Sequence, residues 1–455
     1  MALFDAIYLS DEMRGIFSAE ATAQAWLDVE AALARAQAEI GMIPASAAAA
    51  ITRAARTSDL DLAKLDADTR ALGWPILPLV HQLSDRCGDD AGGYVHWGAT
   101  TQDIMDTGLV LQLRAAWTVI DRDLGAIQEI LIDLAQRHRS TLMAGRTHGQ
   151  HALPLTFGFK AAVWLDEMTR HRHRMAESRS RVLTLQFGGA VGTLASLGDD
   201  GLAVRAALAR ELGLSEPVIS WHVSRDALAE AYGLAAAAAT TAEKIAQEIW
   251  LLMKTEIGEL AEPAIPGRGG SSTMPQKRNP VTCELVATCA AAARRDAAAS
   301  VESMRHDHER GMGPAHQEWY LTPTAIPRAG TALSLIKSVL ADLIVDADRM
   351  RANLDITQGL LLAEAVMMEL AQRTGRQKAH VLMKDVCHRA IAENRPLYDV
   401  MAETTAVTDV LTPDALGACL DPANYLGTAD AMIDRAIAAA RRPIPHKAHQ
   451  NNMEA

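Results

Sequence analysis

Apolar residues recur at three- and four-residue steps over several long stretches of this chain. In the clearest stretch, residues 224–262, the apolar positions are Leu228, Ala231, Leu234, Ala238, Ala242, Ile245, Ile249, Leu252 and Ile257. Residues 109–137, 155–185 and 329–343 have similar spacing. This spacing places apolar side chains on one face of an α-helix, and a helix over the whole first stretch would be about 58 Å long at 1.5 Å per residue. The pattern predicts long helices that bury their apolar faces in a bundle.

The distribution of proline favours the same interpretation. No proline lies between Pro78 and Pro154 or between Pro154 and Pro217, so the chain can form long helices there. No comparable run shows the two-residue alternation of a β-strand. We therefore predict an all-α fold of three helical domains, with the long-helix bundle in the central one. The predicted divisions are 1–103, 104–350 and 351–455.

The composition is typical of a helical protein in water. The chain has 455 residues, of which 49% are hydrophobic, and a formal net charge of −12. Alanine, leucine, glutamate and arginine, which favour helices, are abundant. The negative charge argues against broad binding to nucleic acid or to a membrane surface. It leaves room for a locally basic pocket that binds an acidic substrate.

The cysteines and the N-terminal residues indicate the cellular compartment in which we expect the protein. Five scattered cysteines lack the two-residue spacing of metal or redox pairs, which indicates free thiols in a reducing environment. The N-terminal residues lack a basic start followed by an apolar run, and no uncharged apolar stretch is long enough to span a bilayer. We therefore expect a cytoplasmic protein with neither nucleic acid nor membrane as partner.

Residues 269–280, GGSSTMPQKRNP, combine several groups that can do chemistry. Two glycines permit backbone angles closed to other residues, so the segment can move. The hydroxyls of Ser271 and Ser272 lie near the cation of Lys277 and the amide of Asn279 in the sequence. A mobile loop with these groups suits an enzyme that removes a proton from beside a carboxylate. The same composition also fits an ordinary surface turn.

The order of these residues resembles the signature loop of the fumarase/aspartase superfamily, G-S-S-x-M-P-x-K-x-N, with every fixed position filled. Further segments match in the family's order from about residue 4 to residue 427. The resemblance implies three helical domains, a twenty-helix bundle formed by four subunits, and active sites that each draw on three subunits. It makes Ser271 the general base, with Lys277 stabilising the charge that develops on a substrate carboxylate. The substrate-binding residues that we assign in this loop are Ser272, Met274 and Asn279.

A second segment, GRTHGQ at residues 145–150, resembles the family's T-H-x-Q element. Its His148 is the candidate for proton transfer because imidazole titrates near neutral pH, while Thr147 and Gln150 can hydrogen-bond a substrate carboxylate. Glu284, shortly after the signature loop, stands where the family's eliminating members carry a glutamate paired to this histidine. A carboxylate can orient an imidazole and stabilise its cation. Taken alone, the two would be an ordinary polar histidine and a solvated helix glutamate.

A third segment, HWGATTQD, begins at His96 and resembles the family's H-x-G-x-T-S-x-D element. Thr101 replaces the usual serine, and either hydroxyl can donate a hydrogen bond. The resemblance assigns substrate binding to His96, Thr100 and Thr101, and shaping of the site to Gln102 and Asp103. Threonine and aspartate before an apolar run also suit a helix cap, and both interpretations can hold together.

Arg225 and the run HDHER, residues 306–310, are secondary candidates for binding anionic groups. The close spacing of His306, His308 and Glu309 also permits a metal site, but no further cluster completes a cage. We therefore assign no metal ion, and the proposed chemistry needs no cofactor.

The whole chain looks most like the branch that contains adenylosuccinate lyase and 3-carboxy-cis,cis-muconate cycloisomerase. The opening FDAIYLSDEMRGIF and the late DPANYLG resemble the cycloisomerases, which typically carry a bulky apolar residue in place of the T-H histidine and lack the glutamate. Because His148 and Glu284 are both present, we predict a C–N lyase that releases fumarate from an N-substituted aspartate, acting on small dicarboxylates as a homotetramer. The alternative is cycloisomerisation of 3-carboxy-cis,cis-muconate. A non-catalytic helical scaffold would predict a damaged signature loop, and the loop is intact.

Overall fold

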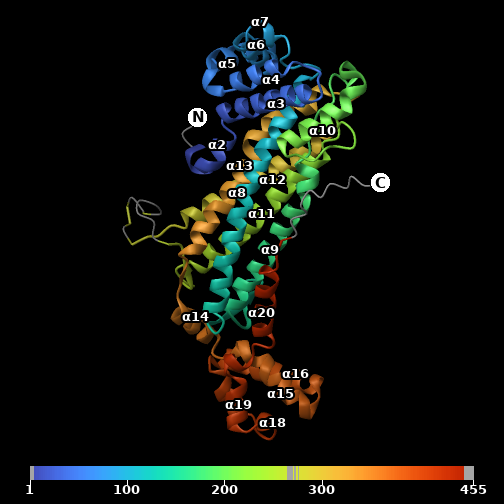
Figure 1. The fold of residues 1–455 in the computed structure, drawn as a ribbon. Helices are drawn as coiled ribbons and strands as arrows, with labels where there is room; N and C mark the ends of the chain where they lie inside the picture. Colours follow the sequence, from blue (N-terminus) through green and yellow to red (C-terminus); the bar gives the residue numbers. More distant parts are fainter. Residues whose placement is uncertain (1–4, 264–269, 271–272, 275, 445–455) are drawn as a thin grey trace.

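The computed structural model of the chain is an elongated bundle of long helices with smaller helices at both ends (Figure 1). The structure describes residues 5–263, 270, 273–274 and 276–444. The long helices of the centre are α8 (Thr101–Arg137), α9 (Phe157–Val182), α11 (Asp226–Leu252), α12 (Val281–Glu302) and α13 (Met312–Ala341). The prediction of an all-α fold with a central long-helix bundle is confirmed.

The core of the bundle consists of the apolar positions that recur along these helices. Leu113, Ile120 and Leu131 on α8 are fully buried, as are Ile245 and Ile249 on α11. Burying such a side chain contributes roughly 1.5–3 kcal/mol relative to leaving it exposed. The three- and four-residue spacing in the sequence therefore corresponds to one buried stripe on each helix.

The central helices differ from the predictions in several places. Helix α8 begins at Thr101 and not at residue 109, and α12 was not among the predicted stretches. The helix predicted over residues 224–262 ends at Leu252, after which the chain turns and forms the short strand β3 (Leu260–Ala261). This strand pairs with β4 (Ile344–Val345). In contrast, α13 is longer than predicted because it runs through Pro323 and Pro327. Proline usually interrupts a helix, and here α11 and α12 pack along α13 and support it.

A β-hairpin follows α8, and the sequence analysis did not predict it. Strand β1 (Leu142–Thr147) pairs antiparallel with β2 (Gln150–Thr156). The turn residues His148 and Gly149 both have positive φ, 51° and 76°, as the commonest two-residue hairpin turn requires. The strands are too short for their alternation to stand out in the sequence. The T-H element therefore lies on a hairpin.

Smaller helices cover the ends of the bundle (Figure 1). Those before α8 are α1 (Asp5–Tyr8), α2 (Asp11–Ile16), α3 (Ala19–Glu39), α4 (Ala45–Ala54), α5 (Leu62–Leu72), α6 (Ile76–Cys87) and α7 (Asp89–Gly92), and α10 (Gly201–Leu212) packs on α3. Those at the other end are α14 (Ala347–Leu354), α15 (Ala363–Thr374), α16 (Arg376–Glu393), α17 (Leu397–Ala402), α18 (Thr405–Thr408) and α19 (Pro413–Cys419). The last helix, α20 (Ala429–Ala440), returns to pack on α9. The domain divisions at residues 103 and 350 stay predictions.

None of the helices within the described ranges has the length and apolar character needed to cross a bilayer.

Candidate active site

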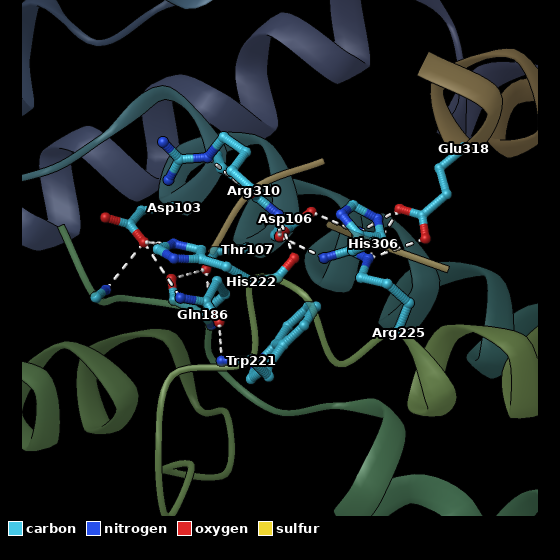
Figure 2. A network of polar contacts seen from close by, with 12 residues as sticks. Asp103, Asp106, Thr107, Gln186, Trp221, His222, Arg225, His306, Arg310 and Glu318 are labelled. Carbon is cyan, nitrogen blue, oxygen red and sulfur yellow. Dashed lines mark hydrogen bonds and ion pairs between the residues drawn. The ribbon is translucent and has the colours of Figure 1, made fainter. Parts of the chain in front are cut away.

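The start of α8 lies within a network of polar contacts (Figure 2). Thr100 is the N-cap residue, and its backbone N–H donates to Asp103 Oδ2 at 3.0 Å. This is the helix cap that the sequence predicts. The cap fixes Thr100 and Thr101 at the positive end of a 37-residue helix, where negative charge is stabilised.

Asp103 is fully buried and organises the surrounding chain. Its carboxylate accepts hydrogen bonds from the backbone N–H groups of Gly188 and Gly189, both at 2.9 Å, and lies 2.7 Å from His222 Nε2. A Cβ atom on Gly188 would lie 2.4 Å from Ser220 Oγ, so the close approach requires glycine. Asp103 therefore holds the segment that contains Gly188 and Gly189 against α8, and its oxygens are occupied by these donors.

Arg225 is buried between two carboxylates (Figure 2). Its Nη atoms donate to Asp106 at 2.7 and 2.9 Å, and its Nε donates to Glu318 at 2.9 Å. Burial alone lowers the pKa of Arg225, but the two carboxylates outweigh burial and raise it. Burial also raises the pKa of Glu318, against the opposing effect of Arg225. A substrate carboxylate would have to displace one of these partners, so the assignment of Arg225 to substrate binding stays a prediction.

The run at residues 306–310 forms a loop after α12 and reaches the start of α8. Arg310 Nε donates to Gln102 Oε1 at 2.8 Å. Arg310 Nη2 is buried, and none of the described residues accepts its hydrogens. Burial and the charge of Arg225 lower the pKa of the neighbouring His306. An unpaired buried guanidinium nitrogen is costly unless a ligand or water accepts from it, so Arg310 is suited to an anionic ligand.

A cavity of about 380 Å³ lies at the start of α8, beside Arg310, and we call it the α8 cavity. Its polar lining includes Thr100, Thr101, Gln102 and Arg310. Asp106, Arg225 and Glu318 also line it, and the two carboxylates are paired with Arg225. The remaining lining is apolar and includes Trp74 and Trp319. The volume lies within the range of roughly 300–1,000 Å³ that is usual for small-molecule sites. The structure thus brings the HWGATTQD segment and Arg310 together at one site.

His96 is oriented by a buried carboxylate that the sequence analysis did not identify. Its Nδ1 lies 2.6 Å from Oε1 of Glu30, which is only 2% exposed. Burial lowers the pKa of His96, but Glu30 and Asp103 outweigh that effect, so the pKa is raised. Glu30 precedes His96 by 66 residues and interrupts the largely apolar buried stripe of α3. A charged residue within such a stripe is the only local indication of its role.

The described part of the signature loop lies beside a second cavity, of about 950 Å³. Met274, Lys277 and Glu284 line it, and all three side chains are exposed. Asn279 lies just before α12. Ser271 and Ser272 lie outside the described residues, so their assignments as base and substrate ligand stay predictions.

His148 and the HWGATTQD segment lie at opposite ends of α8. This helix has 37 residues and is therefore about 55 Å long, which no side chain spans. Thr147, His148 and Gln150 are all exposed at the hairpin tip. One chain therefore does not bring these two segments together, and the predicted pairing of His148 with Glu284 is not made within the part of the chain that the structure describes.

An ion pair anchors the hairpin. Arg146 donates from both Nη atoms to the fully buried carboxylate of Glu259, at 2.9 and 2.6 Å. Asn353 on α14 donates to the same carboxylate at 2.7 Å. The exposed tip that carries His148 is thus held on a rigid base.

No group of three or more potential metal-ligating side chains occurs among the residues that the structure describes. This observation concerns only the described part of the chain, and the signature loop is incomplete in it.

The long-helix bundle and the three separated polar segments define an enzyme class, the fumarase/aspartase superfamily. A family model described as lyase matches residues 8–294, and one described as adenylosuccinate lyase C-terminus matches residues 359–436. The chain belongs to this lyase family, as the resemblance implies.

Individual relatives show which members of the family this chain resembles. A 3-carboxy-cis,cis-muconate cycloisomerase of Pseudomonas aeruginosa is 46% identical over 439 residues, which cover 96% of each chain. The crystal structure of the 3-carboxy-cis,cis-muconate lactonizing enzyme from Pseudomonas putida has a TM-score of 0.91 at 43% identity, covering 96% of this chain and 98% of that one. That of a fumarate lyase from Mesorhizobium sp. BNC1 has a TM-score of 0.90 at 46% identity, covering 96% and 100%.

The cycloisomerases among these relatives overturn the prediction of a fumarate-releasing C–N lyase and favour the alternative, cycloisomerisation. The C–N lyase prediction depended on the presence of His148 and Glu284. Both side chains are exposed in the described chain, and they are not paired with each other there. Similarity to cycloisomerases along almost the whole chain outweighs these two positions.

Proposed function

We propose that this protein catalyses cycloisomerisation of 3-carboxy-cis,cis-muconate, or of a close analogue, to a lactone. The observation that carries the proposal is the 46% identity to a cycloisomerase over 96% of both chains. The α8 cavity adds chemical support, because the substrate carries three carboxylates. A guanidinium nitrogen that has no acceptor among the described residues and a helix N-terminus both favour such groups.

The reaction leaves the carbon skeleton intact. One carboxylate oxygen of the substrate adds to a carbon of its own C=C bond, and the π electrons move to the neighbouring carbon, which lies beside another carboxylate. That carbon then takes up one proton. No fragment leaves the molecule, and charge accumulates on the adjacent carboxylate before protonation, where positioned donors can stabilise it.

The assigned residues fit these steps. Ser271 delivers the proton to carbon, and Lys277 with Asn279 stabilises the carboxylate on which charge develops. Thr100, Thr101 and Arg310 hold a second carboxylate in the α8 cavity. Because α8 separates this cavity from His148, we propose that a homotetramer assembles each site from several chains, with His148 and Glu284 orienting the carboxylate that adds.

Incubation with 3-carboxy-cis,cis-muconate tests the function. We expect the ultraviolet absorbance of the diene to fall, a lactone to appear by NMR, and no fumarate to form. The control is Ser271→Ala, which should retain helical circular dichroism and lose turnover. Persistence of the substrate at high enzyme concentration would contradict the proposed function, and near-normal turnover by Ser271→Ala would contradict the role of that hydroxyl.

A further inference from the structure

Two tryptophans, with a histidine packed against them, lie at the α8 cavity. Trp74 comes from the segment between α5 and α6, and Trp319 comes from α13. Their ring centroids are 5.2 Å apart with an interplanar angle of 83°. His316 stacks on Trp319 at 4.7 Å and 21°, and meets Trp74 edge-on at 5.7 Å. The rings therefore hold one another at fixed angles, an arrangement that aromatic side chains favour. We call Trp74 and Trp319 the aromatic wall.

The aromatic wall is not part of the bundle core. Both tryptophans are only partly buried, and their uncovered surface contributes to the cavity lining. Leu72 and Leu77, about half exposed at 50% and 48%, extend the apolar lining. Clustered apolar surface in a concave site indicates a ligand that covers it. The ligand must therefore have an apolar part as well as a charged one.

The polar lining of the same cavity indicates where the charged part binds. Arg310 reaches the start of α8 through its hydrogen bond to Gln102, and its buried Nη2 has no acceptor within the described chain. Thr100 and Thr101 stand at the helix N-terminus beside it. A ligand that fills the cavity thus presents a carboxylate to Arg310 and an apolar segment to the rings.

We propose that the aromatic wall is a specificity determinant that selects a flat, conjugated carbon chain joined to the carboxylate at Arg310. A conjugated diene is planar and has a π face that can meet an aromatic ring, whereas a saturated chain of the same length bends freely and has no such face. The inference deepens the proposed function and rests on it for the identity of the substrate. It adds the residues that distinguish unsaturated from saturated carboxylates.

Binding of two matched ligands, measured by calorimetry on the intact enzyme, tests the inference. The probes are cis,cis-muconate and adipate, which share six carbons and two terminal carboxylates and differ only in unsaturation. We expect the wild-type enzyme to bind muconate more tightly. Trp319→Leu and Trp74→Leu are each expected to weaken muconate binding about 3- to 10-fold, as loss of an aromatic contact should, and to leave adipate binding unchanged.

Two further variants separate specificity from folding. Trp319→Phe keeps a flat ring and should retain the preference for muconate. Tyr320→Leu removes the next aromatic residue on α13, which is 80% exposed and is not part of the cavity lining, and should behave as wild type. Equal weakening of both ligands by the leucine variants, or loss of the preference in Trp319→Phe, would overturn the inference.

The measurement does not depend on turnover. A wild-type enzyme that prefers muconate through these tryptophans but forms no lactone would refute the proposed function and support the aromatic wall. An enzyme that forms lactone but binds the two probes equally would support the function and overturn the aromatic wall.

Discussion

Buried carboxylates orient the basic side chains around the start of α8. Glu30, Asp103 and Glu318 are all buried. Their basic partners are His96, His222 and Arg225. Each pair offsets part of the cost of burying the two groups. The surrounding side chains are therefore fixed before a ligand arrives, and Arg310 Nη2 is left as a donor for it.

Replacement of Glu30 should have an effect that depends on pH. Glu30 raises the pKa of His96 above its ordinary value of 6.5. A raised folded-state pKa gives stability that is fully present below the unfolded pKa and is lost as pH rises through the folded pKa. We expect Glu30→Gln to lower the pKa of His96 in an NMR titration, and to destabilise the protein more at about pH 6 than at about pH 9. Equal destabilisation at both pH values would contradict the role of the pair.

Replacement of Arg310 should mainly weaken substrate binding. We expect Arg310→Gln to raise KM about 10- to 100-fold, the range for loss of a hydrogen bond to a charged group, with a smaller change in kcat. The control is Arg305→Gln, which alters a strongly exposed arginine of the same loop and should leave both constants unchanged. A normal KM in Arg310→Gln, measured by steady-state kinetics, would exclude Arg310 from the site.

Sequence order identified the motif segments but not the contacts that complete them. The cap at Thr100 follows from a local pattern that can be recognised in the sequence. The contacts of His96 with Glu30, and of Arg310 with Gln102, join residues 66 and 208 positions apart. No periodicity encodes such contacts, because they arise only when distant parts of the chain pack together.

At the scale of elements, apolar spacing predicts α8, α9 and α11 because each presents one buried stripe to the core, but it does not predict α12. It overextends α11 beyond Leu252, where apolar residues continue but the chain turns. It misses the hairpin, whose strands alternate for only a few residues, and it stops short on α13 because of Pro323 and Pro327. In each case tertiary packing overrides the local preference.

The base of the hairpin should be sensitive to loss of its ion pair. Arg146→Met leaves the carboxylate of Glu259 buried without its cation, and removing one partner of a buried pair typically costs about 3–5 kcal/mol. We expect a loss of that size in the free energy of unfolding measured with urea. Arg137→Met breaks an exposed pair with Asp133 and should cost about 0.5 kcal/mol or less. Similar losses in both variants would show that the hairpin does not depend on this pair.

At the scale of the whole molecule, the length of α8 determines how sites can form. A helix of 37 residues separates Thr100 from His148 by more than any side chain spans. The proposed roles of both residues in one reaction therefore require more than one chain. The sequence supports this arrangement only through the family resemblance, because no pattern within one chain predicts which residues of another subunit it contacts.

Mixed assemblies test the sharing of sites. His148→Asn and Ser271→Ala should each be inactive alone. If these residues come from different chains, co-refolding equal amounts should restore about one quarter of the sites, because each site takes its two residues at random from the two variants. Recovered turnover, with each variant refolded alone as the control, is the expected result. Complete inactivity of the refolded mixed oligomer would show that one chain supplies both residues.

The most direct test of the central claim is turnover of 3-carboxy-cis,cis-muconate in D₂O, followed by NMR. Intramolecular addition with proton delivery beside a carboxylate predicts a lactone of unchanged carbon skeleton. One deuterium should lie on the carbon that joins the oxygen-bearing ring carbon to a carboxylate. A skeleton that is cleaved, a release of fumarate, or a lactone without deuterium at that carbon would contradict the proposed chemistry.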